Sequence, residues 1–274
     1  MSRIRLIDQQ ENHHAHSIYG AVEIRDVVRT YRINEQVLPV LAGVNLDVRA
    51  GEFVSIVGRS GCGKSTLLRL IAGLDPDYEG EIHLDGTVIR GTSLDRGMVF
   101  QDAALFPWMT LQENVGFALL KRNDLSEEEK AHRVTEAIRL VNLTGFETAW
   151  PRQLSGGMAQ RGAIARGLVN QPKLLLLDEP FGALDALTKT HLQRELQQIW
   201  MRQKNTMIMV THDVEEAVFL GDKVVVMEAG PGGIRRTIRI PFPHPRDPTS
   251  SAFQRIKEEI LNDLVGDGLL PGRD

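Results

Sequence analysis

Residues 58–66 read GRSGCGKST and match the pattern G-x-x-x-x-G-K-[ST]. They follow the apolar run FVSIV at residues 53–57 and precede STLLRLIAGL at residues 65–74, which has a helical pattern. Glycines in such a loop let successive backbone N–H groups point inward at phosphate oxygens, and the following helix presents its positive end there. The stretch therefore predicts a strand, a phosphate-binding loop and a helix, which is the frame of a P-loop protein.

The residues of this loop are expected to surround the phosphates of a nucleotide. Lys64 would reach the terminal phosphates, and the Ser65 hydroxyl would bind Mg²⁺. The chain's only cysteine, Cys62, lies inside the loop, so we expect alkylation to block the site by bulk and bound nucleotide to protect it. The candidate phosphate-binding residues are Gly58, Arg59, Ser60, Gly61, Cys62, Gly63, Lys64, Ser65 and Thr66.

Two adjacent carboxylates end a further apolar run. KLLLLDEP at residues 173–180 is apolar up to Asp178, and TMIMVTHD at residues 206–213 repeats the pattern. Apolar runs interleaved with helices predict a parallel sheet covered on both faces, whose polar strand ends meet at one edge. There Asp178 can hold the same Mg²⁺, usually through water, and Glu179 can accept a proton from an attacking water. Two acids at a strand end are also common in a solvated turn, but their pairing with a P-loop favours the catalytic interpretation.

The segments around this core differ in character. Residues 1–20 are polar, and we interpret them as a tail. A metal site among the histidines of this tail is the weaker interpretation, because no second ligand cluster follows at zinc-like spacing. The β-branched residues at positions 21–48 predict strands. The histidines of the tail are His13, His14 and His16.

The middle and the end of the chain have helical patterns. Residues 102–167 are predicted to form a mainly helical subdomain, in which Ser126 and Glu129 have the spacing of a capping box. Residues 241–274 hold a proline-rich connector and a further amphipathic helix. We expect the nucleotide-binding domain to span residues 21–240.

Composition limits the classes of partner. The chain has 274 residues, of which 42% are hydrophobic, and a net charge of -4. No run of basic residues suggests a surface for nucleic acid. A single cysteine excludes an internal disulfide and fits a reducing compartment. No apolar run approaches the roughly 18 residues of a spanning helix, and the start lacks the apolar core of a secretory signal, so we expect the chain itself to stay out of the membrane.

A second candidate anion site lies in RQLSGGMAQR at residues 152–161, where a serine and two glycines precede a helical pattern. The segments GRSGCGKST, FQDAALFPW, LSGGMAQR, LLLLDEP, GALD and VTHD stand in the order and at the spacing found in ATP-binding cassette (ABC) transporter ATPases. The chain resembles that family over about residues 21–240. The resemblance implies an α/β P-loop NTPase fold with a mainly parallel core sheet, an antiparallel β subdomain and a helical subdomain.

The resemblance assigns roles to further residues. Tyr31 matches the aromatic residue that stacks on adenine, although a tyrosine near a strand end is as often part of the core. Gln101 matches the Q-loop glutamine that senses Mg²⁺ and links to the membrane subunits. Asp185 matches the D-loop aspartate. His212 matches the switch histidine that contacts the γ-phosphate and orients Glu179.

The second anion site then serves another chain. In this family the signature serine and glycines close over the nucleotide of a second ATPase subunit, so Ser155, Gly156 and Gly157 would face Lys64 of a partner in a homodimer with two ATP molecules. The sequence departs from the commonest signature at Met158, where glutamine is usual. That departure leaves the expected grip on phosphate intact but removes any polar role for this side chain.

The remaining partners also follow from the resemblance. Four segments together resemble the bacterial nitrate, sulfonate and taurine importer ATPases, a group that also includes homologues for bicarbonate and pyrimidine precursors: FQDAALFPWMTLQENV, LSGGM, DEPFGALDALT and IPFPHPRDPTSSAF. This resemblance implies permease subunits, a periplasmic or lipid-anchored solute-binding protein and a place at the cytoplasmic face of the inner membrane. The apolar cluster between Gln101 and Met109 would contact the permease; core packing is the alternative. Soluble ABC ATPases that act on nucleic acid or the ribosome are the alternative class, but they usually carry two cassettes, a long coiled coil or a zinc insert. A small kinase would have no use for the LSGGM segment.

Overall fold

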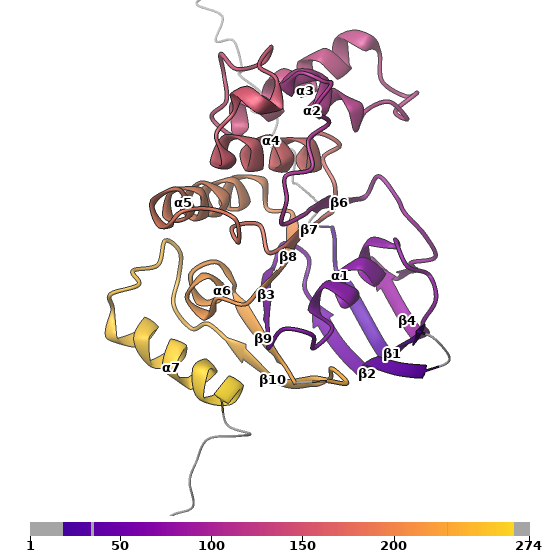
Figure 1. Ribbon diagram of the computed structural model, residues 1–274, viewed down its shortest axis with the longest axis vertical. Helices are drawn as coiled ribbons and strands as arrows, with labels where there is room; N and C mark the ends of the chain where they lie inside the picture. Colours follow the sequence, from indigo (N-terminus) through magenta and orange to yellow (C-terminus); the bar gives the residue numbers. More distant parts are fainter. Residues whose placement is uncertain (1–18, 34–35, 229, 266–274) are drawn as a thin grey trace, which may run out of the picture.

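The computed structural model describes residues 19–33, 36–228 and 230–265. The predictions for His13, His14 and His16 lie outside the described residues. Figure 1 shows the described chain as a central sheet with helices on one side, a smaller sheet on the other and a helical lobe at one end. Among the described residues, no helix combines the length and the apolar character needed to cross a bilayer.

Two strands begin the described chain, and strands and helices are interleaved after residue 50. The strands are β1 (Val22–Ile33), β2 (Gln36–Val48), β3 (Phe53–Val57), β4 (Glu79–Leu84), β5 (Thr87–Val88), β6 (Arg96–Val99), β7 (Leu174–Asp178), β8 (Thr206–Thr211), β9 (Lys223–Met227) and β10 (Ile234–Arg239). The helices are α1 (Lys64–Ala72), α2 (Leu111–Phe117), α3 (Glu127–Leu140), α4 (Gly156–Leu168), α5 (Ala186–Gln203), α6 (Val214–Leu220) and α7 (Ser251–Val265), with a 3-10 turn at Pro151–Gln153.

The core sheet has the strand order β10-β9-β3-β8-β7-β6. Its strands are parallel except for the edge strand β10, which is antiparallel to β9. In β7, Leu175 and Leu177 belong to the hydrophobic cluster on one face, whereas Leu174 and Leu176 belong to the cluster on the other. Burial on both faces explains why these strands are continuously apolar, and the predicted mainly parallel core sheet is confirmed.

The smaller sheet is antiparallel and has the order β2-β1-β4-β5. It shares a hydrophobic cluster with α1 and with one face of the core sheet. Figure 1 shows α1 between this sheet and the core strands. The antiparallel β subdomain that the resemblance implied is therefore present.

The chain between β6 and β7 is mainly helical and forms a lobe with α2, α3 and α4 at one end of the molecule (Figure 1). The predicted capping box at the start of α3 is confirmed, since Ser126 accepts from the N–H of Glu129 and Glu129 accepts from the N–H of Ser126. A second capping box, between Thr110 and Glu113, starts α2. These caps fix where two helices of the lobe begin, because each satisfies backbone donors that the helix leaves free.

Candidate functional site

Four polar segments follow the carboxyl ends of neighbouring parallel strands. The P-loop follows β3, Gln101 follows β6, Asp178 ends β7 and His212 follows β8. The registers align these ends, with Val57 of β3 opposite Thr211 and Asp178 opposite Val210. Four segments that lie far apart in sequence therefore meet at the sheet edge where open α/β sheets bind ligands.

A left-handed glycine and a buried lysine fix the conformation of the P-loop. Gly63, the residue before α1, has φ +94°, and a Cβ built there would lie 2.6 Å from a methyl carbon of Leu41, so only glycine fits. The Nζ of Lys64 donates to the carbonyls of Gly58 at 2.9 Å and Arg59 at 3.2 Å. Lys64 is only 6% exposed, which places its charge directly beneath the loop.

Cys62 does not occupy the position that alkylation of the site requires. Its side chain is 1% exposed and belongs to the hydrophobic cluster that α1 shares with the small sheet. The Sγ lies so close to Gly58 that a Cβ there would be 2.6 Å away. The Cys62 side chain therefore points into the protein, and the expectation that alkylation of this thiol blocks the site is wrong.

Ser65 joins the P-loop to the end of β7. Its Oγ donates to Oδ1 of Asp178 at 2.8 Å. Burial raises the pKa of Asp178; the bond from Ser65 opposes this rise, and the charge of Glu179 adds to it. The two oxygens are hard donors of the type that Mg²⁺ prefers, so this pair fits the ion expected from the sequence. Among the described residues, no group of three or more His, Cys, Asp or Glu side chains is placed to hold a metal ion.

Glu179 and His212 form the second polar pair at this edge. The Nδ1 of His212 lies 2.9 Å from Oε2 of Glu179. An ionised carboxylate can only accept, so we assign the proton of this bond to Nδ1. Glu179 is held at φ +44°, a left-handed conformation uncommon for a residue other than glycine, and its backbone N–H donates to the carbonyl of Val210. Neighbouring strands thus fix both partners of the pair.

A hollow of about 250 Å³ lies over the P-loop. Glu179 reaches it from across the sheet edge, and Tyr31 and the signature residues are not among its lining. Tyr31 instead donates its hydroxyl to Asp75 at 3.0 Å, and the Arg29 guanidinium lies 4.2 Å from its ring centre. Its role with adenine stays a prediction. The hollow is lined by Val40, Ser60, Gly61, Gly63, Lys64, Ser65, Thr66 and Glu179.

Gln101 lines a different hollow of about 400 Å³, between the start of α4 and the loop after β7. Its side-chain amide lies against Gly182, where a Cβ would be 3.0 Å from Nε2. The segment around it is tied to α4 by Gln160, which donates to the carbonyl of Phe100, and by Arg166, which donates to that of Ala104. The role of Gln101 as an Mg²⁺ ligand therefore stays a prediction. Its side chain does contact Gly182, in the loop that follows Glu179.

The signature residues begin α4 in the helical lobe. Ser155 caps the helix by accepting from the N–H of Met158, and Gly156 is its first residue. Gly157 packs so tightly on Thr188 of α5 that a Cβ would lie 2.4 Å from the Thr188 methyl carbon. Ser155 is exposed, and the lobe that carries it stands apart from α1 in Figure 1.

Asp185 caps α5 by accepting from the N–H groups of Leu187 and Thr188. A hydrogen bond with the Thr188 side chain, followed by the one with the Thr188 N–H, lowers the pKa of Asp185. Asp185 and Ser155 therefore begin adjacent helices whose first turns are in contact through Gly157 and Thr188.

The family model described as "ABC transporter" matches residues 41–182. This chain belongs to the ABC transporter family. As the sequence predicted, it is an ATPase of the type that is coupled to transport.

Individual relatives match nearly the whole cassette. The aliphatic sulfonates import ATP-binding protein SsuB of Bacillus cereus is 45% identical over 91% of this chain and 98% of its own length. The nitrate import ATP-binding protein NrtD of Synechocystis is 46% identical over 87% of this chain and 89% of its own length. Both relatives agree with the predicted resemblance to importer ATPases.

Solved ABC cassettes have the same fold. A dimeric structure of the cassette MJ0796 in a post-hydrolysis state, bound to ADP and Pi, has a TM-score of 0.70 and 35% identity over 82% of this chain and 99% of its own length. The structure of cbiO1 from Clostridium perfringens has a TM-score of 0.72 and 25% identity over 90% of this chain. The fold class expected from the sequence is therefore confirmed.

The departure at Met158 has a structural explanation in this ABC ATPase. Met158 is partly buried and packs against the main hydrophobic cluster. Its backbone N–H, not its side chain, completes the cap with Ser155. An apolar side chain is therefore compatible with the signature.

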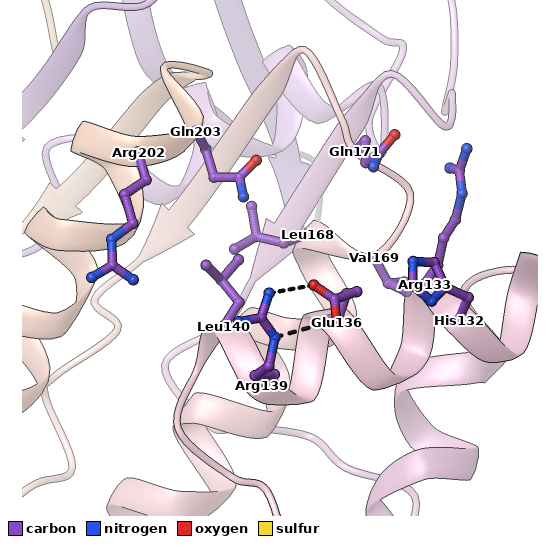
Figure 2. A pocket seen from close by; sticks show the side chains of 11 residues that line it. His132, Arg133, Glu136, Arg139, Leu140, Leu168, Val169, Gln171, Arg202 and Gln203 are labelled. Carbon is purple, nitrogen blue, oxygen red and sulfur yellow. Dashed lines mark hydrogen bonds and ion pairs between the residues drawn. The ribbon is translucent and has the colours of Figure 1, made fainter. Parts of the chain in front are cut away.

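A further cavity of about 400 Å³ lies between α3 and the ends of α4 and α5. Figure 2 shows Arg139 paired with Glu136 near Leu140 and Leu168. Arg139 lies in the last turn of α3 and Arg202 in the last turn of α5, where a cation is favourable because the helix end carries partial negative charge. None of the motif residues lines this cavity, so we assign it to packing between helix ends.

Sequence reasoning missed a charged group behind His212. Lys189 of α5 contacts Asp213 and Glu216, which lie on either side of the start of α6. Asp213 ends the VTHD segment, but Lys189 and Glu216 belong to no motif, so only their closeness in sequence to Asp185 and His212 could have indicated them.

Proposed function

We propose that this chain is the ATP-hydrolysing subunit of a bacterial importer for a small anion such as a sulfonate, taurine or nitrate. It would work as a homodimer that holds two ATP molecules between its subunits, as a peripheral protein at the cytoplasmic face of the inner membrane. The observation that carries the proposal is that Lys64, Ser65, Asp178, Glu179 and His212 gather at one sheet edge while the signature stands on a separate lobe.

Separation of the two anion sites argues for a dimer. Ser155, at the start of α4, does not line the hollow over the chain's own P-loop. An exposed serine and helix N-terminus aimed at phosphate would find their ligand on a second subunit related by a two-fold axis. The MJ0796 cassette is dimeric in its structure with bound ADP and Pi, which supports a dimer here.

The binding residues would act on the phosphates of ATP. Lys64 supplies a fixed positive charge beneath the loop, and the backbone N–H groups of residues 60–66 supply donors. Ser65 and Asp178, with Gln101 from the next strand, would hold Mg²⁺, which when bound offsets negative charge on the phosphates. Because Ser65 and Asp178 are already in contact, little side-chain rearrangement is needed before they bind.

Glu179 is the group that we assign as general base. It lines the P-loop hollow, and within the described ranges His212 is the side chain that contacts its carboxylate. His212 would orient it through the Nδ1 bond. A water beside the terminal phosphate would give its proton to Glu179 as the oxygen attacks phosphorus, which releases ADP as the leaving group.

The permease would contact an aromatic patch on the helical lobe, which consists of Phe106, Trp108 and Phe117. The ring centres of Phe106 lie 5.5 Å from Trp108 and 4.7 Å from Phe117. Trp108 is 66% exposed and Leu120 nearby in sequence is 65% exposed, which is unusual for large apolar side chains unless a partner covers them. The patch follows Gln101 directly, so docking there would couple the permease to the nucleotide site.

Replacement of Glu179 by glutamine tests the catalytic proposal. We expect the purified wild-type chain to hydrolyse ATP, and the Glu179→Gln variant to lose about 100-fold or more of this rate while it still binds ATP, because an amide cannot accept the proton. Size-exclusion chromatography with ATP should then show an accumulated dimer.

Full hydrolysis by the variant would remove Glu179 from the role of base. Stimulation of the wild-type ATPase by nucleic acid or ribosomes, with none by the permease, would favour the soluble class of ABC ATPase. The solute is tested separately, by identification of the permease and binding protein that copurify with the chain and by ligand screening on the latter. A bound sulfonate, taurine or nitrate is expected, and a cation or neutral sugar would contradict the proposed solute class.

A further inference from the structure

Lys189 joins three elements behind the switch histidine. Its Nζ lies 2.7 Å from Oδ2 of Asp213 and 2.6 Å from Oε1 of Glu216. Lys189 comes from the first turn of α5, where its backbone N–H donates to the carbonyl of Asp185. Asp213 is the residue after His212 and caps α6, and Glu216 lies in the first turn of that helix.

The same group also holds the residue before His212. The hydroxyl of Thr211 donates to the second carboxylate oxygen of Glu216 and accepts from the backbone N–H of Asp213 at 3.0 Å. Thr211 is 1% exposed and Glu216 is 3% exposed. Both neighbours of His212 in the chain are therefore fixed by one buried network, although the His212 ring itself is 61% exposed.

Lys189 is the only cation bonded to the two carboxylates in the part of the chain that the structure describes. Burial would raise the pKa of Asp213, but the bond from Lys189 and the capped N–H groups outweigh burial and lower it. For Glu216 burial prevails over Lys189 and Thr211, and its pKa is raised. Without Lys189, the buried carboxylate of Glu216 and the partly buried carboxylate of Asp213 would lie close together without a cation, and such a pair cannot remain ionised in place at low cost.

The start of α5 is also packed against the signature helix. Thr188, next to Lys189, fills the space above Gly157, and its N–H donates to Asp185. A continuous set of contacts therefore runs from Gly157 through Thr188 and Lys189 to the loop of His212. Asp185 and the signature are both expected to meet a partner subunit. Asp185 caps the helix that carries Lys189, and the signature begins the adjacent helix α4.

We propose that Lys189 is a positioning residue for ATP hydrolysis. It holds the His212 loop against the first turn of α5, so that His212 keeps its hydrogen bond with Glu179 when the signature and Asp185 contact a partner subunit. The proposal rests on the proposed ATPase function. It assigns no contact between Lys189 and ATP, since Lys189 is absent from the lining of the P-loop hollow.

The test compares Lys189→Met with Lys189→Arg in the full-length purified chain. We expect Lys189→Met to lower kcat by about 10-fold or more with less than about a 2-fold change in the KM for ATP, because the missing bond misplaces a catalytic group without touching the binding residues. Lys189→Arg keeps a positive charge and should recover at least half of the lost activity. Lys257→Met is the matched control, because Lys257 pairs with Glu215 on the same helix α6 at an exposed position; its kcat should equal that of wild type.

A double-mutant cycle separates positioning from general stability. If Lys189 acts through His212, adding Lys189→Met to His212→Ala should cause no further loss, whereas independent effects would multiply. ATP-dependent dimer formation in the Glu179→Gln background should persist with Lys189→Met. The proposal would be overturned if the double variant lost activity by the product of the two single losses, or if Lys189→Met prevented dimer formation.

Lys189→Met on its own leaves buried charges and can lower the melting temperature. The pair Lys189→Met with Glu216→Gln removes one charge of each sign and should recover stability while kcat stays low. Recovery of kcat with stability would show that Lys189 only supports the fold. Failure of the wild type to hydrolyse ATP would instead refute the proposed function. That outcome can be told apart, because the His212→Ala variant would then have the same ATPase rate as the wild type.

Discussion

The Oγ of Ser65 donates a 2.8 Å hydrogen bond to the Oδ1 of Asp178, so the P-loop and the end of β7 are joined before any ligand is considered. Asp178 nevertheless has a raised pKa, chiefly because it is buried. Burial of this carboxylate therefore lowers the stability of the nucleotide-free protein, and the bond from Ser65 offsets part of that cost. Strand ends that bind metal and phosphate commonly make this exchange of stability for function.

Replacement of Asp178 by asparagine should separate stability from activity. A carboxyl whose pKa is raised by folding destabilises the folded state once pH rises through that pKa. At pH 7 the nucleotide-free Asp178→Asn variant should therefore melt at or above the wild-type temperature. Its Mg²⁺-dependent hydrolysis should fall by about 10- to 100-fold, the usual cost of losing a group that holds a metal through water.

Scanning calorimetry at several pH values checks the direction of this change in melting temperature. The gain of Asp178→Asn should shrink as pH falls toward 3.8, the ordinary value for aspartate, because the wild-type carboxyl is then neutral. Asp124→Asn is a control with the opposite expected effect. The hydrogen bond from Arg122 lowers the pKa of Asp124 to about 2, so loss of this carboxylate should lower the melting temperature at pH 7. A lower melting temperature for Asp178→Asn at pH 7 would contradict the account of Asp178.

Cys62 should resist alkylation in the folded protein. Its side chain is 1% exposed, so we expect maleimide to label it slowly, at a rate set by unfolding, and MgATP to change that rate only through stability. Cys62→Ser should bind ATP but lose about 1–3 kcal/mol of unfolding free energy, because the new hydroxyl is buried without a partner. Cys62→Ala, which adds no polar group, is the control and should be the more stable of the two; fast labelling of native protein is the opposing result.

The aromatic patch should divide into a docking residue and a packing residue. Trp108 is 66% exposed, so Trp108→Ala should change the unfolding free energy by less than about 0.5 kcal/mol but abolish solute uptake and weaken pull-down of the permease. Phe106 lies between Trp108 and Phe117, and Phe106→Ala should cost about 1–3 kcal/mol. Leu261→Ala, at a 40% exposed apolar residue of α7, is the control, and normal uptake by Trp108→Ala would reject docking at this patch.

Local pattern determined much of this protein. The GRSGCGKST loop with a strand before it and a helix after it, the continuously apolar runs of β7 and β8, and the capping box at Ser126 and Glu129 were all readable from the sequence. Each is set by neighbours in the chain, because helix caps, phosphate loops and strand burial depend on spacings of a few residues. The order of the motifs then specified the family, and with it the meeting of the motifs at one sheet edge.

The tertiary structure alone decided the environment of each side chain. The inward turn of Cys62, the contacts of Tyr31 with Asp75, and the ties of Lys189 to the His212 loop join residues far apart in sequence or depend on which way a side chain points. Asp75 and Lys189 belong to no sequence motif. Long-range packing selects such partners by shape and charge after the strands and helices have assembled, so no local spacing could have indicated them.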